Sequence, residues 1–63
     1  MQLYLGKKKL RIGDRIETFR GEEGKLVKIE YPKKPDSEGR VYVRLGEITK
    51  RYCPSHINAF WKN

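Results

Sequence analysis

Glycine and proline recur along the whole chain and divide it into short segments. The sequence contains six glycines and three prolines, and no segment between them places apolar residues at helical spacing. Short apolar segments separated by turn-forming residues are typical of β-strands joined by turns. The spacing therefore predicts an all-β domain rather than a helical one.

The clearest predicted strand runs from Arg40 to Leu45, where polar and apolar residues alternate. Alternate residues of a strand point to opposite faces of the sheet. We therefore expect Arg40, Tyr42 and Arg44 to share one face and the apolar residues between them to share the other. The dipeptide Gly46–Glu47 then predicts a tight hairpin into the next strand.

Further strands are predicted over 2–5, 9–12, 15–20, 25–31, 48–53 and 59–61. Gly21–Gly24 is predicted to be a tight connection with a glycine at each end, where positive φ has little cost. Leu26 followed by Val27 breaks the alternation, which predicts a bulge or a sharp bend. Pro32–Gly39 contains two prolines that cannot donate ladder hydrogen bonds, so it is predicted to be a loop. Pro54–Ile57 predicts one 3₁₀ turn before the last strand.

Residues 1–63 are expected to form one domain, because a chain this short has room for only one core. A small flat sheet would leave its edge strands unpaired, and closing the sheet into a barrel removes those edges. The sequence therefore favours a single small β-barrel.

Two glycine motifs in the first half of the chain resemble those of a known family. The matching residues are Gly13-Asp14-Arg15-Ile16, then Gly21, Gly24, Leu26 and Ile29. Their order resembles the KOW domains, which belong to the SH3-like barrels. The resemblance implies an SH3-like barrel of about five short antiparallel strands with one 3₁₀ turn before the last strand. The glycine loop of KOW domains often contacts RNA, but here it contains Glu22 and Glu23, which would repel phosphate. We therefore do not assign an RNA-binding role to this loop.

The chain lacks cross-links and predicted membrane segments. Cys53 is the only cysteine, so no internal disulfide can form, and a lone cysteine is typical of a reducing compartment. The apolar start of the chain is too short for a signal peptide, and no apolar stretch approaches the roughly 20 residues that span a bilayer. These features predict a cytoplasmic protein that does not contact a membrane.

Positive charge dominates the chain. Fifteen lysines and arginines against eight acidic residues give a net charge of +7. The excess lies at the N-terminus and in the second half. Such a surface attracts polyanions through counterion release, but it can also serve only to keep a small protein in solution.

The candidate nucleic-acid contacts lie in three basic segments. They are Lys7, Lys8, Lys9 and Arg11 near the N-terminus, Arg40, Tyr42 and Arg44 on the central strand, and Lys50 and Arg51 on the strand that follows. Arginine can bind phosphate and tyrosine can stack on a base. The N-terminal segment is either a flexible arm that follows phosphates or a solvated turn between two edge strands. At most one of Lys50 and Arg51 can share the face of Arg40 and Arg44.

A second interpretation is a protein-interaction module. Aromatic residues near the last short helix and the long loop of SH3-like barrels can line a peptide groove, and Tyr31, Tyr52 and Trp61 are the candidates here. Lys33 and Lys34 lie in the long loop, which could meet a protein or a phosphate or could be only a connector. Association of copies through an edge strand is compatible with either interpretation, and the sequence does not define the oligomeric state.

Catalysis and metal binding find little support in the sequence. Cys53 and His56 have Cys-x-x-His spacing, but a structural zinc needs four ligands and the chain offers no other cysteine or histidine. A cysteine nucleophile would need a pocket and oxyanion donors that a domain of this size hardly supplies. We therefore expect no enzyme activity, no metal, no cofactor and no small-molecule substrate, and we expect Cys53 to be a small buried apolar residue.

Overall fold

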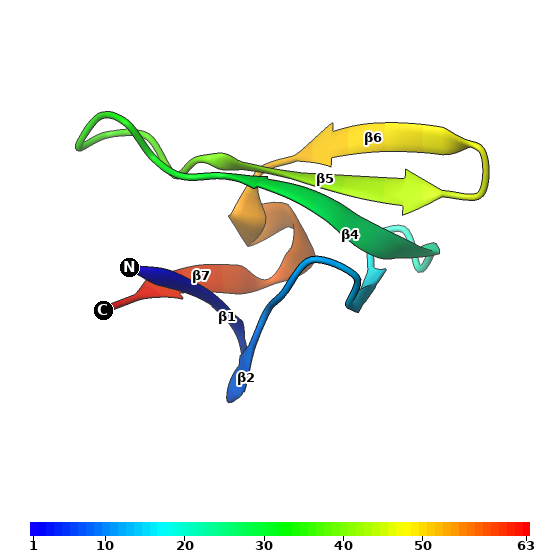
Figure 1. The fold of residues 1–63 in the computed structure, drawn as a ribbon, viewed down its shortest axis with the longest axis horizontal. Helices are drawn as coiled ribbons and strands as arrows, with labels where there is room; N and C mark the ends of the chain where they lie inside the picture. The colour runs from blue at the N-terminus through cyan, green and yellow to red at the C-terminus, as the bar shows by residue number, and fades with distance from the viewer.

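The computed structural model describes residues 1–63 as two antiparallel sheets with no α-helix (Figure 1). Its elements are β1 (Gln2–Leu5), β2 (Lys8–Lys9), β3 (Arg15–Glu17), β4 (Glu23–Glu30), β5 (Arg40–Leu45), β6 (Ile48–Tyr52), the 3₁₀ helix η1 (Pro54–Ile57) and β7 (Ala59–Lys62). The predicted all-β class is confirmed. The sheets have the strand orders β2-β1-β7 and β3-β4-β5-β6, and their strand pairs do not close into one barrel.

The larger sheet is built around β4 and β5. In β5, Val41 and Val43 are fully buried whereas Arg44 is exposed, so the predicted alternation is confirmed. In β4, the register against β5 shifts between Leu26 and Lys28. This shift leaves Leu26 in the core and Val27 exposed, which confirms the predicted bulge.

A two-residue turn joins β5 to β6, and Leu45 pairs with Ile48 across it. Gly46 has a φ of +67°, which glycine adopts without a steric penalty and which suits the first position of a type II′ turn. The Nε atom of Arg44 donates a hydrogen bond of 2.9 Å to the Gly46 carbonyl. The hairpin is therefore specified locally, as the sequence predicted. The strand β6 forms one edge of the larger sheet and pairs only with β5.

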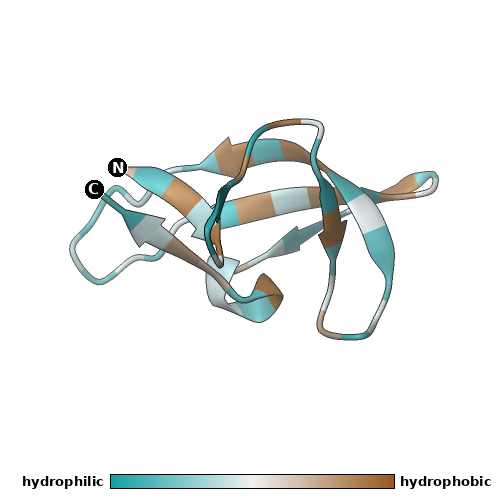
Figure 2. Ribbon diagram, turned by 90° about the horizontal axis from the view of Figure 1, so that it is seen from below, coloured by the Kyte–Doolittle hydropathy of each residue, from teal (hydrophilic) through white to brown (hydrophobic).

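The smaller sheet and η1 cover one face of the larger sheet (Figure 1). The core lies between them and contains Leu3, Leu10, Ile16, Leu26, Val41, Val43, Tyr52, Ile57 and Ala59. Figure 2 shows the corresponding alternation of hydrophobic and hydrophilic bands along the strands. No helix in the structure combines the length and the apolar character that a membrane crossing requires.

The sequence prediction fails around Thr18, where β3 ends three residues earlier than predicted. Thr18 is buried, and its Oγ1 accepts hydrogen bonds of 3.3 Å from the backbone N–H groups of Arg20 and Glu22. These bonds replace strand pairing with a compact loop. The connection to β4 therefore lies at residues 18–22.

Gly24 has a different role from the predicted one. It lies inside β4 and has no positive φ, unlike Gly21. A Cβ atom at Gly24 would lie 2.5 Å from the carbonyl oxygen of Arg44. Gly24 is therefore required for the close approach of two strands and not for a turn.

The N-terminal strand pair is also shorter than predicted. β2 contains only Lys8 and Lys9, and the chain then turns over Arg11–Asp14. Leu10 is buried beside this short strand, and its N–H donates a hydrogen bond to the Leu3 carbonyl. The predicted strand over 9–12 is therefore only partly present.

Candidate nucleic-acid interface

The larger sheet presents a bare face on the side away from β1, β7 and η1 (Figure 1). Neighbouring strands place paired residues on the same face, and the β4–β5 and β5–β6 registers bring basic side chains together on this outer side. The name basic face is used here for Lys25, Lys28, Arg40, Arg44 and Arg51, together with Glu30 and Tyr42 between them. Five cations and one carboxylate give it a net charge of +4.

The registers place these side chains in rows across the strands. Lys28, Tyr42 and Arg51 form one row, and Lys25 and Arg44 form the next. At the β3 end of the same sheet, acidic residues balance the charge, and Arg15 forms an ion pair of 3.8 Å with Glu23. The positive potential is therefore concentrated on β4, β5 and β6.

Tyr42 is less free to stack on a base than the sequence predicts. Its ring is half-buried, its hydroxyl donates a hydrogen bond to Oε1 of Glu30, and Nζ of Lys28 lies 5.2 Å from the ring centroid. The hydrogen bond from Tyr42 is the main cause that lowers the pKa of Glu30, and the charges of Lys28, Lys33 and Arg51 lower it further. A base could reach the ring face that Lys28 covers only if that lysine moved.

Lys50 lies on the other face of the sheet. It pairs with Val43, whose side chain is buried on the inner face, whereas Arg51 pairs with Tyr42 on the outer face. The expectation that only one of these two cations shares the face of Arg40 and Arg44 is thus confirmed, and that cation is Arg51.

The N-terminal lysines belong to a hairpin and not to a flexible arm. Lys8 and Lys9 form β2, which pairs with β1, and Figure 1 places this hairpin on the side of the molecule away from β5 and β6. Nζ of Lys8 lies 3.9 Å from Oδ2 of Asp14. The structure therefore separates Lys7, Lys8, Lys9 and Arg11 from the basic face.

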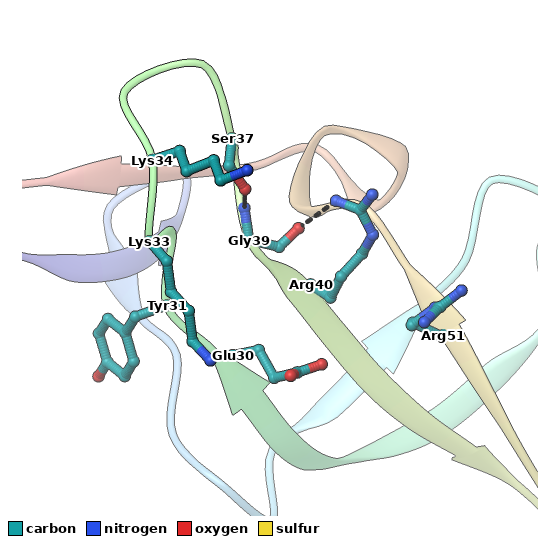
Figure 3. Close-up of a pocket in the computed structure, with 8 residues that line it drawn as sticks. All are labelled: Glu30, Tyr31, Lys33, Lys34, Ser37, Gly39, Arg40 and Arg51. Carbon is teal, nitrogen blue, oxygen red and sulfur yellow. Dashed lines mark hydrogen bonds between the residues drawn. The ribbon is translucent and has the colours of Figure 1, made fainter.

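The long loop adds two cations beside the basic face. A hollow of about 350 Å³ lies between this loop and the sheet, and Figure 3 shows the residues that line it. Its lining residues are Glu30, Tyr31, Lys33, Lys34, Ser37, Gly39, Arg40 and Arg51. The role of Lys33 and Lys34 is open from the sequence, because only the strand pairing brings Arg51 into the lining of the same hollow.

Two hydrogen bonds and the conformation of Gly39 hold this loop in place. The backbone N–H of Ser55 in η1 donates to a carboxylate oxygen of Glu38 at 3.0 Å, and Nε1 of Trp61 donates to the Glu38 carbonyl at 2.6 Å. Gly39 is buried with a φ of +77°, and a Cβ atom there would lie 2.4 Å from the Glu30 carbonyl oxygen. The hydrogen bonds from Ser55 are the main cause that lowers the pKa of Glu38.

The three predicted peptide-groove aromatics do not lie together. The rings of Tyr31 and Trp61 are 5.0 Å apart between centroids, but Tyr52 is only 9% exposed and belongs to the core. Tyr52 instead contacts Phe19, which is 64% exposed and also lies against His56. Phe19 is not among the site residues that the sequence predicts.

Cys53 is half-buried and free, whereas the sequence predicts a small buried residue. It precedes η1, and its carbonyl accepts a hydrogen bond of 2.9 Å from the N–H of His56. The cysteine thus takes part in the backbone of the 3₁₀ turn. No three histidine, cysteine or acidic side chains lie close enough together to hold a metal ion.

The segment that resembles KOW domains forms a tight turn before β3. The N–H of Asp14 donates to the Arg11 carbonyl at 3.1 Å, and the Asp14 carboxylate accepts from the Arg11 N–H at 2.9 Å.

Searches against models of protein families, curated proteins and solved structures return no match to this chain.

Proposed function

We propose that this chain is a small nucleic-acid-binding module with little sequence specificity, and that the basic face is its binding surface. The observation that carries the proposal is that none of the five cations of this face is used in an ion pair. The two ion pairs of the molecule are Lys8 with Asp14 and Arg15 with Glu23. The charge of the face is thus available to a polyanion.

The proposed binding relies on phosphate contacts. Arg44 and Arg51 are exposed, and guanidinium groups bind phosphate with two parallel hydrogen bonds. Contacts to phosphates position a protein on nucleic acid but carry no sequence information. A face of cations whose only aromatic ring is half-buried therefore fits an accessory role better than recognition of a particular sequence.

We further propose that the two sheets are an open variant of the SH3-like barrel, related to KOW domains. The order of elements supports this proposal, with short antiparallel strands followed by a 3₁₀ turn and a last strand. The motif Gly13-Asp14-Arg15-Ile16 at the start of β3 supports it as well. Binding without catalysis and a cytoplasmic location remain predictions from the sequence.

Binding to mixed-sequence DNA and RNA, measured at 50 and 200 mM salt, tests the function. We expect a dissociation constant below about 100 μM at the lower salt, which is the weak end of non-specific binding, and a strong loss of affinity at the higher salt. Backbone amide shifts on addition of the oligonucleotide should concentrate at Lys28, Arg44 and Arg51. Affinity weaker than this limit for every nucleic acid tested would end the proposal.

One observation favours a second function, a protein-interaction module that uses the edge of the larger sheet. The edge strand β6 has no second partner strand, and Ile48 on it is 61% exposed. Phe19 adds an exposed aromatic ring that contacts Tyr52 of the same strand. Amide shifts along β6 or at Tyr31 and Trp61 with a protein partner, without shifts on the basic face, would favour this function. Sedimentation would show whether copies of the chain associate through the same edge.

A further inference from the structure

We propose that the hollow under the β4–β5 loop binds a phosphate monoester, the group found at the end of a nucleic-acid strand. The proposal deepens the proposed function and rests on it, because a bound nucleic acid would supply the phosphate monoester. It assigns to the hollow a different task from the rest of the basic face, which contacts phosphodiesters along a strand.

Four cationic residues line the hollow, and they belong to two separate parts of the chain. Lys33 and Lys34 come from the loop, and Arg40 and Arg51 come from the neighbouring strands β5 and β6 (Figure 3). None of the four forms an ion pair. Only Arg40 donates a hydrogen bond within the protein, from one guanidinium nitrogen to the Gly39 carbonyl at 2.7 Å. Most of their donors are therefore free for a ligand.

Of the carboxylates in and beside the loop, Glu30 and Glu38 accept hydrogen bonds within the protein, whereas Asp36 is exposed in the loop and does not line the hollow. Glu30 is the only acidic residue that lines the hollow, and its carboxylate accepts the hydrogen bond from Tyr42. The carboxylate of Glu38 accepts from the N–H of Ser55 in η1. Four cations and one carboxylate leave a net charge of +3 in the hollow, and Glu30 is the one group there that repels an anion.

The loop is shaped before any ligand binds. The N–H of Ser37 donates to the Lys34 carbonyl at 3.0 Å, and the N–H of Gly39 donates to Oγ of Ser37 at 3.2 Å. Pro32 and Pro35 restrict the backbone beside the two lysines, and Glu38 is tied to Trp61. Little backbone freedom is therefore lost on binding, which favours affinity.

A monoester fits this charge better than a diester does. A terminal phosphate carries close to two negative charges above pH 7, whereas each phosphodiester along a strand carries one. One more negative charge near a net charge of +3 should strengthen binding by about tenfold, taking exposed charge pairs at their usual strength.

The test compares one 12-nucleotide single strand with a 5′-phosphate, with a 3′-phosphate, and with hydroxyls at both ends, by competition at 50 mM salt and pH 7.5. We expect a phosphorylated strand to bind about ten times more tightly than the hydroxyl strand. The double variant Lys33→Gln/Lys34→Gln should abolish this preference while it still binds the hydroxyl strand. The control Lys7→Gln/Lys9→Gln removes the same charge from the N-terminal hairpin and should keep the preference.

Inorganic phosphate, followed by amide shifts, distinguishes the sources of the group. Shifts at Lys33, Lys34 and Arg40 with phosphate alone, but no binding of any oligonucleotide, would support the hollow with free phosphate as its ligand and would refute the proposed function. Equal affinity for phosphorylated and hydroxyl strands would refute the hollow as a phosphate-monoester site but would not contradict the proposed function. If Lys33→Gln/Lys34→Gln still prefers the phosphorylated strand, the assignment of the hollow is refuted as well.

Discussion

Removing two cations from the basic face should change the salt dependence of binding by a calculable amount. In the variant Arg44→Gln/Arg51→Gln, both changed side chains are exposed. Their loss removes only one hydrogen bond within the protein, from Arg44 to the Gly46 carbonyl, so the fold should be retained at a cost of about 1 kcal/mol. The effect on binding is therefore an effect on the surface.

The magnitude follows from the number of cations on the face. If all five contact phosphates of duplex DNA, log K falls with log salt at a slope of about 4.5, and the variant has a slope of about 2.7. Between 50 and 200 mM salt, the affinity of the native chain should fall roughly 500-fold and that of the variant roughly 40-fold. If the two proteins bind equally at 1 M salt, the variant should bind roughly 60 times more weakly than the native chain at 100 mM salt.

The assay is fluorescence anisotropy of a labelled 12-base-pair duplex at 50, 100 and 200 mM salt. The matched control is Lys7→Gln/Lys9→Gln, which has the same net charge as the variant but leaves the basic face intact. The control should retain a slope close to that of the native chain. If the control lowers the slope as much as Arg44→Gln/Arg51→Gln does, binding follows net charge alone, and the assignment of the basic face is wrong.

Three further predictions concern the loop and its charges. Gly39→Ala should destabilise the fold by about 2–4 kcal/mol in urea unfolding, because it adds a clash with the Glu30 carbonyl to a left-handed backbone. At Gly46 an added Cβ atom would meet open space, so Gly46→Ala should destabilise the fold by about 1–2 kcal/mol. Equal costs for the two substitutions would refute the close approach of Gly39 to the Glu30 carbonyl. Because the pKa of Glu38 is lowered, its carboxylate stabilises the fold fully above the ordinary value of 4.5, and this stabilisation is lost as pH falls through the folded-state pKa. In Glu38→Gln, the urea midpoint should therefore fall less steeply below pH 4.5. An unchanged pH profile would contradict this. Tyr42→Phe should raise the pKa of Glu30 towards its ordinary value in an NMR titration. An unchanged pKa would show that the hydrogen bond from Tyr42 is not the main cause of the lowered value.

The features that the sequence predicts correctly are those whose signals are local. Strict alternation defines β5, two adjacent apolar residues define the bulge at Leu26, and Gly46 defines the hairpin turn. Pro54 begins a 3₁₀ turn as its fixed φ favours. In each case, the residues that decide the backbone conformation are neighbours in the chain.

The features that the sequence does not reveal depend on distant residues. Tyr52 could line a groove or enter the core, and only its pairing with Val41 places it inside. The hollow needs both Lys33 and Arg51 in its lining, and this arrangement follows from the strand order of the larger sheet. The division into two sheets is also a matter of long-range pairing, which glycine spacing alone cannot specify. Thr18 ends β3 through its side chain, although threonine is common in strands.

The composition of β6 has a consequence for how concentrated solutions of this protein behave. If two antiparallel copies met edge to edge along β6 with Lys50 opposite Arg51, cations of one copy would face cations of the other, and like charges directly opposite disfavour pairing. That repulsion weakens when counterions or a polyanion neutralise the cations. We therefore expect turbidity to appear near charge equivalence with a polyanion, and the solution to clear again when either component is in excess.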